Sequence, residues 1–120
     1  MTPAPRLRSF VVAPEVLVAG GLVATLVLWS LPSMLGVWVG GVLALGSLVA
    51  GGLSGLVYHV QLHRALAPLP AGWWWNPTRL HVRLDDAQRR RVMPWFFAGA
   101  CGFVGAMAGS IAFLSAALRL

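Results

Sequence analysis

Two long stretches of the chain carry no formally charged residue. The first lies between Glu15 and Arg64, and the second lies between Arg91 and Arg119. A helix rises 1.5 Å per residue, so the first stretch is about 70 Å long, roughly twice the thickness of the hydrocarbon core of a bilayer. The pattern therefore predicts two membrane crossings in the first stretch and a third crossing in the second.

Residues 30–33, Ser-Leu-Pro-Ser, divide the first stretch, because Pro32 cannot continue the hydrogen-bond ladder of a preceding helix. We expect the three helices at about 11–31, 34–60 and 94–118, with a loop at about 61–93. The predicted fold class is an all-α integral membrane protein, with residues 1–120 forming a single membrane domain.

Composition agrees with this prediction. Hydrophobic residues make up 58% of the chain and charged residues only 10%, whereas about 25% are charged in an ordinary globular protein. These values exclude a cytosolic enzyme and a disordered tail, and a single cysteine excludes a disulfide scaffold. The net charge of +6 would suggest nucleic acid in a soluble protein. Here the arginines flank apolar segments, which favours the positive-inside rule and no nucleic-acid partner.

The distribution of arginine predicts the orientation in the membrane. With three crossings, eight of the nine arginines fall on the same side, and Arg119 is the exception. That side should be the cytoplasm, with the N-terminus inside, the C-terminus outside and the protein in a bacterial inner membrane. A cleaved signal peptide over the first 30 residues is the competing interpretation. No A-x-A-like site follows the apolar stretch, which favours an uncleaved helix.

Small residues recur at alternating spacings of three and four along the second and third predicted helices, which keeps them on one face of each. Close backbone approach through small residues drives helix association in lipid. These seams predict either an antiparallel hairpin of the two helices or a contact with another subunit. The predicted packing residues are Gly40, Ala44, Ser47, Gly51, Ser54, Gly102, Gly105, Gly109 and Ala112.

The cytoplasmic loop combines tryptophan and arginine. Trp73, Trp74 and Trp75 are typical of an interfacial anchor, with a partner hot spot as the alternative. Residues 79–84 alternate with a period of two, which predicts an extended segment with Arg79, His81 and Arg83 on one face, along the membrane surface or against a partner's sheet edge.

The residues after this segment carry helix-start signals. Asp85 and Gln88 have the spacing of a capping box. A short helix with Arg89, Arg90 and Arg91 should follow, and Pro94 should kink it where the third helix enters the bilayer. The arginine triplet is most simply a stop against translocation, and it can also hold anionic lipid such as cardiolipin.

His59 and His63 lie one helical turn apart at the cytoplasmic end of the second helix. This spacing can present two imidazoles to one metal. The spacing alone does not specify a full ligand set, so the favoured interpretation is no cofactor and no metal. The alternative is that one of the two histidines binds haem b or a quinone.

The sequence offers few groups that could take part in catalysis or transport. The sequence contains no recognisable nucleophile–base pair and no phosphate-binding glycine loop, and no charge lies deep in an apolar segment. The sequence therefore predicts a non-catalytic accessory or structural subunit of a larger inner-membrane complex, with other integral membrane subunits and anionic lipid as partners. The first alternative is a haem- or quinone-binding anchor subunit of an electron-transfer complex, and the second is a homo-oligomer that works alone.

Overall fold

A computed structural model of the protein describes residues 14–120. The predicted start of the first helix, residues 11–13, and the first two arginines, Arg6 and Arg8, lie outside the described residues. Within the described part every regular element is helical, as predicted. The elements are α1 (Pro14–Trp29), α2 (Ser33–Leu66), the short 3-10 helices η1 (Trp73–Trp75) and η2 (Pro77–Arg83), and α3 (Asp86–Ala117).

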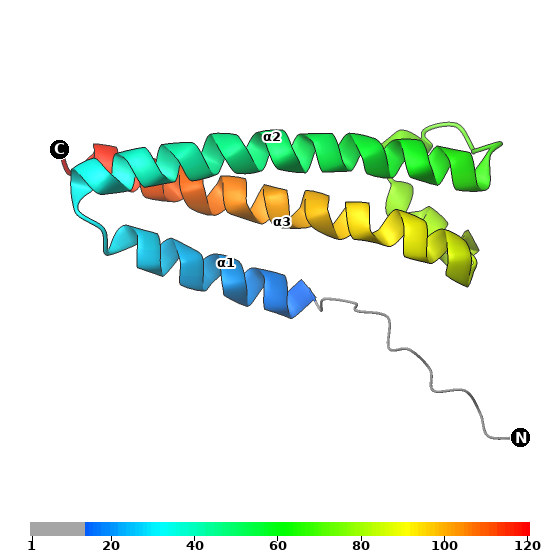
Figure 1. The fold of residues 1–120 in the computed structure, drawn as a ribbon, viewed down its shortest axis with the longest axis horizontal. Helices are drawn as coiled ribbons and strands as arrows, with labels where there is room; N and C mark the ends of the chain where they lie inside the picture. The colour runs from blue at the N-terminus through cyan, green and yellow to red at the C-terminus, as the bar shows by residue number, and fades with distance from the viewer. Residues whose placement is uncertain (1–13) are drawn as a thin grey trace, which may run out of the picture.

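The three α-helices, α1, α2 and α3, form one layer (Figure 1). Helices α2 and α3 run antiparallel and lie side by side along most of their length, while α1 packs on α3 and has few contacts with α2. The elements η1 and η2 lie at the end of α2 and α3 that is remote from α1's connection to α2. We call this the loop end of the molecule.

Two helices, α2 and α3, are long and apolar enough to cross a membrane, and α1 is a shorter apolar helix of 16 residues. Most of the large apolar side chains on α2 are exposed within the chain. A core helix of a soluble protein would instead have most of these side chains buried.

The predicted boundaries of the loop were wrong. Helix α2 continues to Leu66, and α3 begins at Asp86, so the connection is residues 67–85 rather than 61–93. The last turns of α2 stay helical because Leu62 is completely buried there. The arginine triplet and Pro94 belong to one continuous helix, because side chains on both sides of Pro94, Val92 and Phe96, pack into the same cluster.

The extended segment predicted for residues 79–84 was also wrong, because residues 77–83 form the 3-10 helix η2. Leu80 and Leu84 are buried, whereas Val82 between them is 85% exposed. A period-two strand would have put all three on one face. Burial every fourth residue requires a helical turn, and this turn directs His81 inward, away from Arg79 and Arg83.

Two local signals define the ends of the connection. Gly72 has φ +76°, a left-handed conformation that strains any residue with a Cβ, and it starts η1. The predicted capping box is present at the start of α3: Gln88 N donates to Asp85 Oδ1 at 2.7 Å, and Asp85 N donates to Gln88 Oε1 at 3.0 Å.

Candidate functional site

The predicted small residues of α2 and α3 face each other within the same chain. A Cβ added to Gly109 would lie 2.5 Å from the backbone nitrogen of Ala44, and one added to Gly40 would lie 2.6 Å from that of Phe113. Gly51 opposes Gly102, and Gly105 opposes the side chain of Ser47. Ala112 is buried and Ser54 is half-buried. The seam between α2 and α3 is therefore occupied by this chain's own helices.

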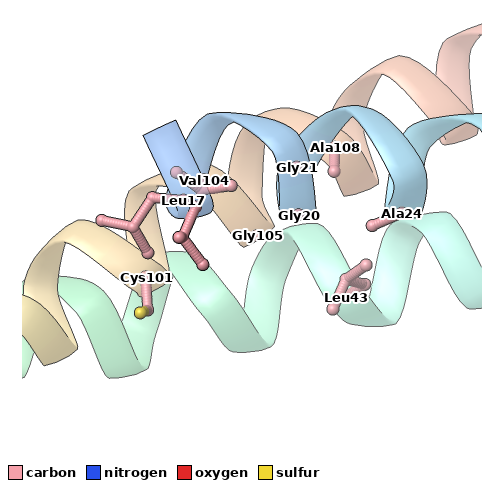
Figure 2. Close-up of a pocket in the computed structure, with 10 residues that line it drawn as sticks. Leu17, Gly20, Gly21, Ala24, Leu43, Cys101, Val104, Gly105 and Ala108 are labelled. Atoms are coloured by element: carbon pink, nitrogen blue, oxygen red, sulfur yellow. The ribbon is translucent and has the colours of Figure 1, made fainter. Parts of the chain in front are cut away.

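A second apolar feature lies where α1 meets the other two helices. Figure 2 shows this groove, which has a volume of about 260 Å³ and is lined largely by Gly20, Gly21, Ala24, Leu43, Cys101, Gly105 and Ala108. The Cys101 thiol is the only polar side-chain group in this lining. A groove of this composition can accept an apolar group, but it offers no acid, base or cation for catalysis.

At the loop end, large side chains replace glycines. Five buried residues form what we call the loop-end cluster: Tyr58, Leu62, Leu80, Leu84 and Val92. Trp73, Met93 and Phe96 pack around them, together with Ala65, Leu66 and Leu69. The cluster draws on α2, η2 and α3, so it fixes the loop against both helices.

Polar bonds reinforce this attachment. The hydroxyl of Tyr58 and Nε2 of His81 share a hydrogen bond of 2.6 Å. Gln88 Nε2 donates to the carbonyl of Ala65 at 2.9 Å, and Arg89 Nη2 donates to the carbonyl of His81 at 3.2 Å. Burial, followed by the positive charge of Arg89, lowers the pKa of His81 below its ordinary value. His81 is therefore held neutral as part of the loop's packing.

His59 is held between two backbone carbonyls. Its Nδ1 lies 2.8 Å from the oxygen of Gly55, and its Nε2 lies 3.3 Å from the oxygen of Trp74. The His59 ring also stacks on the Trp74 indole, with centroids 4.2 Å apart. A neutral imidazole has a single N–H and can donate to only one of these carbonyls, and the shorter contact agrees with Nδ1 as the donor to Gly55. Over residues 14–120, no group of three His, Cys, Asp or Glu side chains is placed to hold a metal ion.

The predicted histidine pair and two of the three tryptophans meet at one hollow. Its volume is about 250 Å³, and its lining residues are His59, Val60, His63, Arg64, Trp73 and Trp74. The ring of His63 lies 5.9 Å from that of Trp73. We call this site the Trp–His hollow. Pockets for drug-sized ligands usually exceed about 300 Å³, so the hollow suits a smaller group.

The other predicted contact residues lie outside this hollow. Trp75 is 89% exposed, and Arg79, Arg83, Arg89, Arg90 and Arg91 are also exposed. The structure thus separates Trp75 from Trp73 and Trp74, although the three are consecutive in the chain.

Sequence reasoning missed two features of the site. The first is Arg64, which the charge pattern presents only as part of the arginine bias, although it directly follows His63 and lines the same hollow. The second is the hydrogen bond between Tyr58 and His81, two residues that are 23 positions apart. No local sequence signal indicates this contact.

Arg119 connects the far ends of α1 and α3. Its Nη1 donates to the carbonyl of Trp29 at 3.1 Å, and its Nε donates to the carbonyl of Ser115 at 3.1 Å. The guanidinium also lies 5.9 Å from the centre of the Trp29 ring. A cation at the C-terminal ends of two helices interacts favourably with their dipoles. This contact gives Arg119 a local structural role.

Comparisons with known protein families, with curated proteins and with solved structures find no match to this chain.

Proposed function

We propose that the protein is a small integral membrane protein that acts as a non-catalytic accessory subunit of a larger inner-membrane complex. The observation that carries this proposal is the apolar face of α2 opposite the seam. Its side chains are large and exposed, with Trp38 70% exposed. They include Trp38, Val42, Leu45, Val49 and Leu56. A continuous apolar face of this length is suited to lipid or to a partner helix.

The positions of tryptophan support insertion in a bilayer. Trp38 is exposed near one end of α2, and His59, which stacks on the exposed Trp74, lies near the other. These two α2 residues are 21 positions apart, a helical rise of about 32 Å. This separation fits a hydrocarbon core of about 30 Å with indoles in both interfaces.

Charge supports a cytoplasmic location for the loop end. Residues 61–93 contain six arginines and two aspartates, a net formal charge of +4. The predicted crossing of the first helix would bring Arg6 and Arg8 to the same side. The role of Arg119 at the ends of α1 and α3 accounts for the one arginine on the opposite side.

Two features of the described residues support an accessory role. They include few groups suited to catalysis, and they expose side chains suited to contact with a partner. No carboxylate, lysine, arginine or histidine lies in α2 between Ser33 and Tyr58. At the loop end, the most exposed apolar side chains are Trp75 and Val82, beside the exposed Arg79 and Arg83. Aromatic and arginine side chains are enriched at protein interfaces, so this surface is suited to a cytoplasmic part of a partner.

The membrane placement is tested by cysteine labelling in a Cys101→Ser background. Cysteines introduced at the exposed positions Thr78 and Leu120 should react with an impermeant maleimide from opposite sides. In intact spheroplasts we expect labelling at 120 only, and in inverted vesicles at 78 only. Labelling of both sites from one side would contradict the proposed topology.

The accessory role is tested by affinity purification from native membranes in mild detergent, at native expression level, with mass spectrometry of the co-purifying chains. We expect a stoichiometric set of larger membrane subunits. The variant Trp75→Ala should lose them, while Phe103→Ala, which removes an exposed aromatic ring far from the loop end, serves as its control. Recovery of the chain alone at a defined oligomeric mass would overturn the accessory role in favour of self-assembly.

A further inference from the structure

Several of the residues that line the mainly apolar Trp–His hollow carry hydrogen-bond donors, and none carries a carboxylate. Arg64, which is exposed, carries a guanidinium, and Trp73 and Trp74 each carry an indole N–H. His63 adds an imidazole, whereas His59 is engaged by backbone carbonyls. A site that combines a guanidinium with several neutral donors is suited to an oxyanion, and it is poorly suited to a metal cation.

The rest of the hollow is apolar. The indole of Trp73 lies 5.7 Å from the ring of His59, and Trp74 stacks on the same ring. Val60, on the outer surface of α2, continues the lining toward the exposed apolar face of that helix. A ligand that fits both parts has an anionic group and an attached hydrocarbon chain.

The position of the hollow along α2 agrees with this chemistry. His63 lies 25 positions after Trp38, a rise of about 38 Å. With Trp38 in one interface, His63 and Arg64 would lie at the depth of the headgroups on the other side. The net formal charge of +4 over residues 61–93 also favours an anionic over a zwitterionic headgroup.

We propose that the Trp–His hollow binds the phosphate group of one anionic phospholipid. Arg64 and His63 contact the phosphate oxygens, the two indoles donate hydrogen bonds or cover the glycerol, and one acyl chain follows the Val60 side of α2. This inference rests on the membrane placement proposed above. It is separate from the arginine triplet of α3, which does not line the hollow.

The test is native mass spectrometry of the full chain in mild detergent, titrated with phosphatidylglycerol or phosphatidylcholine. We expect one phosphatidylglycerol to bind more tightly than the next, and phosphatidylcholine to bind more weakly. Arg64→Gln should weaken the first binding event about tenfold, the effect of losing one charge-assisted hydrogen bond. Arg90→Gln removes the same charge from a residue that does not line the hollow and should change this affinity less than twofold.

A second variant separates shape from charge. Val60→Trp fills the hollow without changing any charge, and it should abolish the first binding event. Circular dichroism and the elution volume of each variant show whether the fold is retained; if Arg64→Gln fails to fold, Val60→Trp carries the test. Equal losses in Arg64→Gln and Arg90→Gln, or no loss in Val60→Trp, would overturn the site.

Two further arms identify the ligand. Inorganic phosphate at millimolar concentration should not displace the lipid, and displacement would show a site for free phosphate instead. A retained mass matching a quinone in the protein as purified would overturn the lipid assignment. A chain that labels with the proposed topology but shows no lipid preference defeats this inference alone, whereas failed labelling defeats the membrane placement.

Discussion

The two halves of α2 meet α3 in different ways. From Gly36 to Gly51 the helices approach through glycine, alanine and serine, with backbone against backbone. From Tyr58 onward they are held by large buried side chains that the loop also covers. In lipid, burying a leucine gives no hydrophobic gain, so close packing through small residues stabilises the contact. In water the hydrophobic effect favours burial of large side chains. The change along α2 therefore agrees with the membrane placement proposed above, in which this helix passes from lipid into water.

The largest effect should come from filling the seam. Gly109→Leu places a side chain against the backbone of Ala44 and Gly40, where no flexible group can move aside. We expect a loss of about 3 kcal/mol or more in stability, measured by thermal unfolding in mild detergent. Gly52→Leu on α2 is the control, since a Cβ there meets nothing within 4 Å. Equal losses in both variants would show that the close approach of the two helices at the seam does not control stability.

The loop-end cluster should respond to the opposite change, from large to small. Leu62 is 0% exposed, and Leu62→Ala should cost about 3 kcal/mol through lost burial and a residual cavity. Val82→Ala removes an exposed side chain of the same region and should cost less than about 0.5 kcal/mol. Hydrogen exchange should show faster exchange in η2 for Leu62→Ala and unchanged exchange at the seam. Faster exchange along the whole hairpin would mean that the two regions unfold together.

A smaller effect is expected at the start of α3. Asp85→Ala removes the half of the capping box in which Gln88 N donates to Asp85 Oδ1 and should cost about 1 kcal/mol. Asp86→Ala, a neighbouring aspartate in the first turn that makes no side-chain cap, should cost less. The measurement is thermal unfolding, combined with the exchange rates of the amides of the first turn. Equal costs would assign the effect to the helix dipole rather than to the cap.

The smallest effect concerns pH. The pKa of His81 is lowered in the folded chain, so below its ordinary value of 6.5 the unfolded state binds more protons than the folded state. The contribution of neutral His81 to the free energy of unfolding should be complete above pH 6.5 and should decrease as the pH falls below that value. His81→Asn should flatten the profile between pH 5 and 7. A profile that is equally steep in this variant would assign the dependence to another group.

The sequence predicted the regions dominated by composition and helical period. The seam residues, the break at Pro32 and the capping box all follow from local spacing. The course of residues 61–85 could not be predicted, because Leu80 and Leu84 take their positions from contacts with Tyr58 and Leu62 rather than from their own spacing. The contact of His59 Nε2 with the carbonyl of Trp74 likewise depends on the position that Trp74 takes in the fold.

The bond from Arg119 to the carbonyl of Trp29 joins residues 90 positions apart. During synthesis at about 5 to 20 residues per second, α1 is complete roughly 5 to 18 seconds before Arg119 is made. For that time the last carbonyls of α1 lack this cation, and the surface that α1 uses against α3 gains its partners only as α3 is made. The contacts of α1, the first of the described helices, are thus completed only when the end of α3 has been made.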